Sequence, residues 1–178
     1  MKSIVAVLWN TNASRMRAVV SQLAGEVSLS VWSGRALSDG TEDFDALCRA
    51  LEKADFCLFN RTASDSIWPQ IMDFMKGKDS PTAYVGSEAL SNITDEKTLR
   101  LSAQLGDYYN YGGLENYENL VRLAASLAGD AAVHYDPPKF LPWEGRFHPD
   151  DGEMVYSDAV AYFAEKKKKG RGTIGLLM

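Results

Sequence analysis

Cysteine and histidine are scarce in this 178-residue sequence, which contains two of each. Two cysteines are too few for a disulfide framework, and the apolar neighbours of Cys48 and Cys57 favour buried free thiols. No apolar run approaches the roughly 18 residues that cross a bilayer, so we expect no membrane span. The apolar residues 4–9 are typical of a buried strand rather than a signal peptide, because no cleavage site follows them. Together these absences favour a cytoplasmic protein.

The motifs of several common enzyme classes are also missing. The sequence has no G-x-S-x-G, H-E-x-x-H or C-x-x-C motif and no Walker phosphate loop. His134 and His148 both lie in one proline-rich segment, whereas a metal site needs three or four converging ligands. The residues alone therefore indicate no catalytic residue, no metal site and no cofactor held by this chain.

Charge is unevenly spread along the sequence. The formal net charge is −5, but residues 1–160 hold 14 basic and 23 acidic residues, and residues 161–178 hold five basic residues and one acid. The acidic first part argues against nucleic acid as a partner, because phosphate binding needs a basic face. The lysine run 166–169 is typical of a solvated helix end, where cations suit the helix dipole, with a docking patch as the alternative.

Residues 1–128 alternate between two hydrophobic periodicities. Strand-length patterns occur at 4–9, 27–32, 55–60 and 82–86, and helical apolar stripes occur at 16–23, 44–51, 67–75, 95–108 and 114–128. Alternating strands and helices predict a parallel sheet with helices on both faces. The strict apolar–polar alternation at 27–32 indicates an edge strand. We therefore expect a three-layer, flavodoxin-like α/β fold with a four-stranded parallel sheet in the order 2-1-3-4.

Two of the expected helices begin beside residues that commonly cap helices. Thr41 is placed to cap the helix at 44–51, with Asp43 among the acidic residues of its first turn. Glu115, Asn116 and Asn119 follow a glycine pair at the start of the helix at 114–128, where we expect them to act as capping groups.

The pattern changes after Gly129. The segment 134–149 holds four of the six prolines together with several aromatic residues, so we expect no regular element there. A helix near 155–168 and a buried strand at 173–178 are predicted to follow. The expected organisation is a flavodoxin-like α/β head domain at 1–129. A connector, a helix and the first strand of a second, truncated α/β unit are expected at 130–178.

Ligands of open α/β sheets bind at the carboxyl ends of the strands. After the first strand, Asn10, Thr11, Asn12 and Ser14 offer the amides and hydroxyls of a phosphate or flavin loop, and Arg61 follows the third strand. This first segment lacks the glycine that lets a backbone approach a phosphate closely. A helix cap formed by Thr11 or Asn12 explains the same residues without any ligand, and both interpretations stay open.

The proline-rich segment offers a second candidate site. Trp143, Tyr135, Phe140 and Phe147 could stack on a planar molecule, with His148 as an axial ligand. The alternative is that these aromatic side chains pin the segment to the sheet.

Three segments, in this order, resemble a known protein family. They are 54–61 followed by Trp68-Pro69, then 108–120, and then 141–149 followed by 172–177. The most specific patterns are Y-x-x-x-G-G-x-x-N-x-x-N-L from Tyr108 and G-x-(aromatic)-H-P from Gly145. Together they resemble the N-terminal region of the cobaltochelatase large subunit and of its relative, the H subunit of magnesium chelatase.

This resemblance implies a role in cobalamin-type tetrapyrrole biosynthesis. The family is an ATP-dependent metal chelatase (a ligase) that uses ATP with Co²⁺ or Mg²⁺ through other regions and other subunits. The implied partners are the ATPase subunits or the rest of the large subunit, and a corrin or porphyrin is an implied ligand. No catalytic residue carries over to a position of this sequence. We therefore expect an N-terminal fragment or truncated homologue that serves as a scaffold, partner-contact or tetrapyrrole-proximal domain and inserts no metal alone.

Two other functions stay open beside this one. A flavodoxin-like, FMN-binding electron carrier is suggested by the expected fold alone, and the glycine-free first segment and the four-strand count argue against it. A small module that binds a planar ligand through the segment 134–149 is the other.

Overall fold

A computed structural model describes residues 1–62, 65–86, 95–140, 146–148 and 152–154, and the chain divides into two compact units, Met1–Lys139 and Phe140–Met178. The first unit contains a parallel sheet in the order β2-β1-β3-β4. Its strands are β1 (Lys2–Leu8), β2 (Val27–Ser33), β3 (Phe56–Phe59) and β4 (Thr82–Tyr84). The predicted strand order and the edge position of β2 are confirmed.

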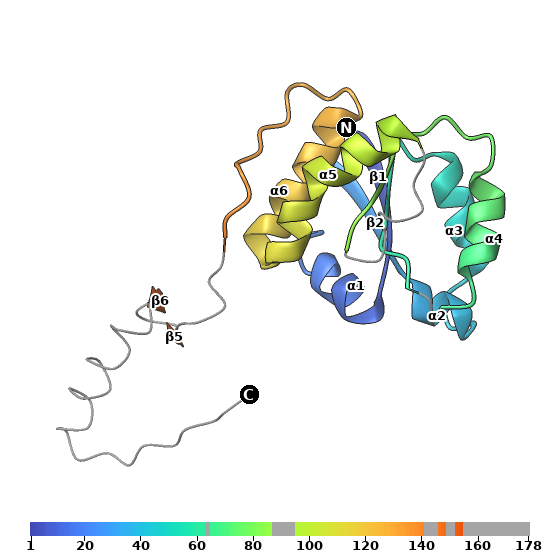
Figure 1. The fold of residues 1–178 in the computed structure, drawn as a ribbon, viewed down its shortest axis with the longest axis horizontal. Helices are drawn as coiled ribbons and strands as arrows, with labels where there is room; N and C mark the ends of the chain where they lie inside the picture. The colour runs from blue at the N-terminus through green and yellow to red at the C-terminus, as the bar shows by residue number, and fades with distance from the viewer. Residues whose placement is uncertain (63–64, 87–94, 141–145, 149–151, 155–178) are drawn as a thin grey trace, which may run out of the picture. The chain divides into compact units, whose positions relative to one another are not determined.

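Helices cover both faces of this sheet (Figure 1). One face carries α1 (Asn10–Arg17), α5 (Glu96–Tyr111) and α6 (Leu114–Leu127). The other face carries α3 (Phe44–Glu52) and α4 (Trp68–Met75), together with the short helix α2 (Gly34–Ser38) that follows β2. The α/β class with flanking helices is confirmed, while α2 was not predicted.

The central position of β1 in the sheet explains why its sequence is apolar without interruption. Successive side chains of a strand point to opposite faces, so Ile4, Ala6 and Leu8 enter the core under α1, α5 and α6. Val5 and Val7 enter the core under α3 and α4. All five are at most 1% exposed. Each large apolar side chain buried in this way contributes roughly 1.5–3 kcal/mol relative to an exposed one.

Some predicted helix boundaries are wrong. The stripe at 16–23 predicted a helix there, but α1 begins at Asn10 and ends at Arg17, and hydrogen-bonded turns follow. The stripe marked burial rather than helix, because Val19 and Leu23 enter the core from those turns. Asp43, not Thr41, caps α3: its carboxylate accepts a hydrogen bond from the backbone N–H of Asp45, 2.9 Å away.

Asn116 and Asn119 do not cap α6, whose N-cap is Gly113 without a side-chain cap. Their side chains instead hold the chain after α6. Asn116 accepts a hydrogen bond from the Lys139 N–H and donates one to the Lys139 carbonyl, both at 2.8 Å. Asn119 accepts one from the Asp136 N–H at 2.9 Å.

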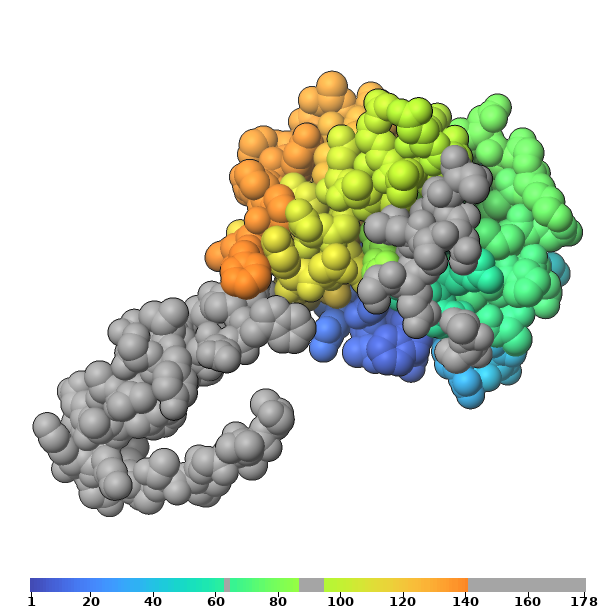
Figure 2. Space-filling model, in the orientation of Figure 1, coloured from blue at the N-terminus to red at the C-terminus, as the bar shows by residue number. Residues whose placement is uncertain are grey.

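The segment 136–139 therefore lies along the helices. The Tyr108 hydroxyl on α5 adds a hydrogen bond to the Asp136 carbonyl at 2.7 Å. Figure 2 shows the orange surface of the end of α6 and the residues after it beside the yellow-green surface of α5. In the described part of 134–149, these hydrogen bonds run to α5 and α6 and not to the sheet.

The second unit has a short antiparallel pair of strands, β5 (Arg146–His148) and β6 (Gly152–Met154). The expectation that 134–149 holds no regular element is wrong at β5, whose three residues contain no proline and whose His148 pairs with Gly152. Trp143, the helix expected near 155–168 and the strand expected at 173–178 lie outside the described residues. Within the described ranges, no helix has the length and apolar character needed to cross a bilayer.

Asp55 joins the starts of β1 and β3 and should make stability depend on pH. Its carboxylate accepts hydrogen bonds from the Ser3 N–H at 2.8 Å and from Lys2 at 3.1 Å, and these contacts hold its pKa below the ordinary value of 3.8. A lowered pKa stabilises the fold above pH 3.8, and this stabilisation is lost as pH falls through the lowered value. We predict that Asp55→Asn lowers the free energy of unfolding at pH 7 and that its effect shrinks towards pH 3.

Urea unfolding at both pH values checks this. Asp79→Asn is the matched control, because Asp79 is exposed and makes no hydrogen bond or ion pair with any other described residue. An Asp55→Asn effect of the same size at pH 7 and pH 3 would contradict the prediction.

Candidate functional site

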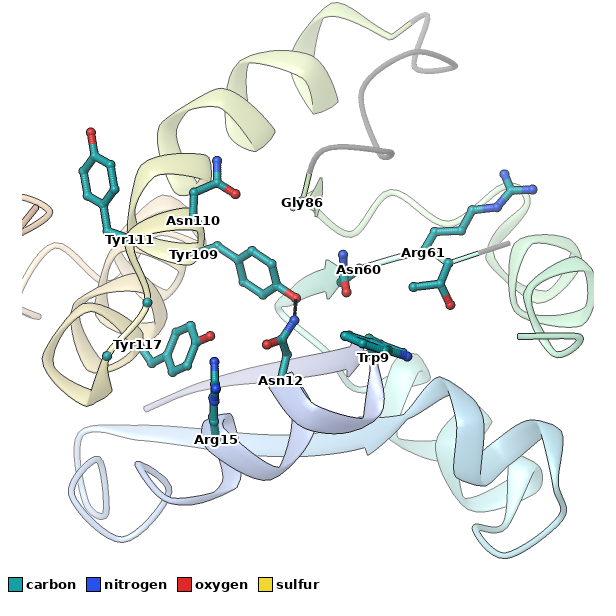
Figure 3. Close-up of a pocket in the computed structure, with 13 residues that line it drawn as sticks. Trp9, Asn12, Arg15, Asn60, Arg61, Gly86, Tyr109, Asn110, Tyr111 and Tyr117 are labelled. Carbon is teal, nitrogen blue, oxygen red and sulfur yellow. Dashed lines mark hydrogen bonds between the residues drawn. The ribbon is translucent and has the colours of Figure 1, made fainter. Parts of the chain in front are cut away.

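The first unit contains a cleft of about 790 Å³ at the carboxyl edge of the sheet. Trp9 follows β1, Asn60 follows β3 and Gly86 lies just past β4, so three neighbouring strands lead into it. This is the edge at which open α/β sheets bind their ligands. Residues of α1, α5 and α6 supply the remaining walls (Figure 3).

Asn60 and Gly86 form a tight part of the cleft wall. The Asn60 side chain donates a hydrogen bond to the Val85 carbonyl at 2.8 Å. Gly86 has a φ of +92°, and a Cβ atom added to it would lie 2.5 Å from the Asn60 amide nitrogen. Only glycine fits here, since any side chain would be strained and would displace Asn60.

Asn12 and two tyrosines connect α1 to α5 and α6. The Asn12 side chain donates a hydrogen bond to the Tyr109 hydroxyl oxygen, which Figure 3 marks with a dashed line. The rings of Tyr109 and Tyr117 lie 6.1 Å apart between centroids. Burial raises the pKa of both phenols, although the Asn12 hydrogen bond opposes this at Tyr109 and Arg15 opposes it at Tyr117. Both hydroxyls therefore stay protonated at neutral pH and can donate hydrogen bonds.

The glycine pair between α5 and α6 brings these tyrosines together. Gly112 and Gly113 have φ values of +67° and +83°, which other residues rarely adopt. They let the chain reverse within two residues, so that Tyr109 before the turn and Tyr117 after it face the same cleft.

Arg15 on α1 and Arg61 after β3 bring two positive charges to the cleft. Figure 3 shows them on opposite sides, with Arg15 directed towards Tyr117. Among the described residues neither guanidinium pairs with a carboxylate, and none of the thirteen described residues that line the cleft is acidic. Residues 1–139 as a whole contain 13 basic and 18 acidic residues, a net charge of −5. The cleft is therefore locally positive on an acidic unit and suits a negatively charged ligand.

The structure places the residues predicted after β1 within α1 rather than in a loop. Asn12 lines the cleft. Asn10 accepts a hydrogen bond from the Ser33 hydroxyl at 3.3 Å, and the Ser14 hydroxyl donates to the Asn10 carbonyl at 3.2 Å. Thr11 is exposed and is not among the lining residues. The helix cap predicted from Thr11 or Asn12 is wrong, because the N-cap of α1 is Trp9.

The other predicted site residues are divided among three places. Arg61 lines the cleft beside Asn60. His148 lies in β5 of the second unit, and Trp143 is outside the described residues. Tyr135 and Phe140 are 38% and 57% exposed.

Sequence reasoning missed Trp9, Arg15, Asn60, Tyr109 and Tyr117 as lining residues. Trp9 and Asn60 could have been found, since each is the last residue of a predicted strand and so lies at its carboxyl end. Arg15 directly follows Ser14, the last residue predicted for the site after the first strand. Tyr109 and Tyr117 lie within the segment 108–120 that carries the family pattern. Their position at the cleft depends on how α5 and α6 pack on the sheet.

Metal and thiol chemistry find little support in the described residues. There, no three His, Cys, Asp or Glu side chains lie close enough together to hold a metal ion. Cys57 is buried in β3, and burial raises the pKa of its thiol to about 12. Neither cysteine is among the lining residues of the cleft.

We predict that Gly86→Ala lowers the free energy of unfolding by about 1–3 kcal/mol more than Gly25→Ala does, the usual cost of forcing an extra carbon into a tightly packed site. Both positions have a strongly positive φ, but an added Cβ meets nothing within 4 Å at Gly25, whereas it collides with Asn60 at Gly86. The comparison therefore removes the backbone cost and leaves the collision. Urea unfolding of the two variants measures it, and equal losses would mean that the Asn60–Gly86 contact is loose.

Comparison with known proteins gives a family match for the C-terminal part of the chain and a similar solved structure. Residues 106–178 match the family model described as CobN/Magnesium Chelatase. The solved structure titled catalytic subunit of cobaltochelatase from Mycobacterium tuberculosis is similar to this chain, with a TM-score of 0.53 and 14% sequence identity.

This structural similarity covers 83% of the chain but only 12% of that subunit, so the chain spans a small part of its length. At this identity the similarity shows a shared fold. No curated protein matches the sequence. The family match supports the resemblance read from the sequence: residues 106–178, less than half of the chain, match the CobN/magnesium chelatase family model.

Proposed function

We propose that the unit Met1–Lys139 is a head domain of a metal-chelatase large subunit in cobalamin-type tetrapyrrole biosynthesis. It acts in the cytoplasm as a scaffold and partner-contact domain and inserts no metal by itself. One observation supports this most: the residues that match the family model begin inside α5 and continue through α6, which completes the core of the sheet.

The packing of α6 makes the family segment part of the head. Leu120, Val121 and Ala124 are fully buried in the same cluster as Ile4 and Leu8 of β1. The matching residues are therefore not an appendage to an unrelated domain. Residues 1–105 supply the sheet that these helices need in order to bury their apolar faces.

The anchored connector supports a scaffold role. Asn116 and Asn119 hold the backbone at Lys139 and Asp136, where the first compact unit ends. Glu115 adds an ion pair to Lys139 at 3.2 Å. These contacts hold the last residues of the first unit against its own helix α6.

The absence of metal insertion is proposed from length. The chain spans 12% of the cobaltochelatase catalytic subunit that it resembles, so most residues of that subunit have no counterpart here. The partners proposed for the head are the ATPase subunits of a chelatase complex or the remainder of a large subunit.

We predict that this chain, mixed with chelatase ATPase subunits, ATP, Co²⁺ or Mg²⁺ and a corrin or porphyrin precursor, forms no metallated product above a protein-free control. Absorbance spectra of the tetrapyrrole measure the product. A complete large subunit in the same mixture is the positive control. Turnover by this chain above the background rate would contradict the proposal.

A second arm tests the head role directly. A large subunit that lacks its own head region is assayed with and without this chain added in trans. Loss of activity in the headless subunit, with partial recovery on addition of the chain, supports the proposal. Full activity of the headless subunit would show that the head is not needed for chelation.

A further inference from the structure

We propose that the cleft at the carboxyl edge of the sheet binds an organic anion with a flat ring system, a molecule that carries a phosphate or carboxylate group on an aromatic body. This inference goes beyond the head-domain role and stands on the geometry of the cleft. It is tested by binding, so its failure would leave the chelation experiments unaffected.

The cleft has the volume of a small-molecule site. Its volume of about 790 Å³ falls within the roughly 300–1,000 Å³ typical of such sites. Its lining comes from chain segments that the fold brings together, residues 9–15, 60–62, 86 and 109–117. Inorganic phosphate alone would leave most of this space empty, which favours a larger molecule.

Positive charge within the cleft selects an anion. Arg15 and Arg61 come from different elements, lie on opposite sides and pair with no carboxylate among the described residues. A guanidinium forms strong, charge-assisted hydrogen bonds with phosphate and carboxylate oxygens. The amide groups of Asn12 and Asn60 lie between the two arginines and add neutral polar contacts.

The starts of two helices add backbone donors to the same space. Trp9 is the N-cap of α1 and Gly113 is the N-cap of α6, both line the cleft, and neither helix has a side-chain cap. The first N–H groups of a helix lack partners inside the helix and favour an anion.

The other helices of the unit behave differently. The starts of α2, α3 and α5 are each capped by a side chain, and none of the capping residues Ser33, Asp43 and Asp95 lines the cleft. The remaining helix, α4, also has no side-chain cap and does not line the cleft, but proline in its first turn means that it presents one N–H fewer. Side-chain caps are therefore missing where the helix starts meet the cleft.

An exposed indole favours a flat ring as the body of the ligand. Trp9 is 47% exposed and lies at the cleft, whereas the lining residues Tyr109 and Tyr117 are buried and Tyr111 is half-buried. A large exposed aromatic side chain offers a stacking surface, because stacked ring pairs are stabilised beyond the area that they bury. Figure 3 shows the Trp9 side chain between Arg15 and Arg61. A ring stacked on the indole would therefore also lie between the two arginines.

Calorimetric titration of the complete 178-residue chain tests the proposal with two matched probe pairs. FMN carries a phosphate on a flat ring, and riboflavin has the same ring without the phosphate. 1-Pyrenecarboxylate carries a carboxylate on a flat ring, and 1-pyrenemethanol lacks it. Inorganic phosphate is the anion without a ring.

We predict that FMN or 1-pyrenecarboxylate binds with a Kd of about 100 μM or tighter, and that its neutral partner and inorganic phosphate bind at least about tenfold more weakly. The pair that binds distinguishes a phosphate from a carboxylate ligand. Millimolar or absent binding of both anionic probes would overturn the proposal.

Arg15→Gln locates the site. The variant should weaken the anionic probe at least about tenfold and leave riboflavin or 1-pyrenemethanol unchanged. Arg100→Gln, on α5 away from the cleft, is the matched control, because it removes an exposed guanidinium without changing the lining. Thermal unfolding confirms that both variants fold. Equal effects of the two substitutions, or none from Arg15→Gln, would overturn the assignment of binding to this cleft.

Discussion

The burial of β1 between two layers of helices is the constraint on which the rest of the first unit depends. One face of β1 packs under α1, α5 and α6, and the other packs under α3 and α4. A strand with apolar side chains on both faces cannot tolerate the loss of either layer, because each exposed side chain would cost roughly 1.5–3 kcal/mol. The helices that match the family model, α6 and the end of α5, are therefore required by a strand at the start of the chain.

The same constraint assembles the cleft. Because β3 pairs in parallel with β1 and β4 pairs in parallel with β3, the ends of these strands bring Trp9, Asn60 and Gly86 to one edge of the sheet. The packing of α5 and α6 over that face then brings Tyr109 and Tyr117 to the same edge. The site is thus a consequence of how the sheet is covered, and no single segment of the sequence contains it.

The sequence predicted well those features that depend on burial of whole strands. Continuous apolar runs and one alternating run were sufficient to predict four strands, their order and the edge position of β2. Helix boundaries were predicted less well, because an apolar stripe reports which side chains are buried and not whether the backbone is helical. Val19 and Leu23 are buried from turns rather than from a helix.

The site residues divide in the same way: the sequence predicted those that depend on strand positions and missed those that depend on packing. Asn12 and Arg61 were found because the strand-end rule needs only the positions of strands. Asn116 and Asn119 were interpreted as caps because local spacing cannot show that the segment 136–139 returns to them. Tyr109 and Tyr117 depend on helix packing, which a single sequence specifies only through the family pattern.

Native-state hydrogen exchange of the complete chain tests most directly whether the family segment and the residues before it form one domain. We predict that the slowest amides of β1 and of α6 exchange with the same free energy of opening, equal to that of global unfolding, because they share one core. Opening of α6 at a clearly lower free energy, while β1 stays protected, would show that the family segment is an independent unit and would contradict this account.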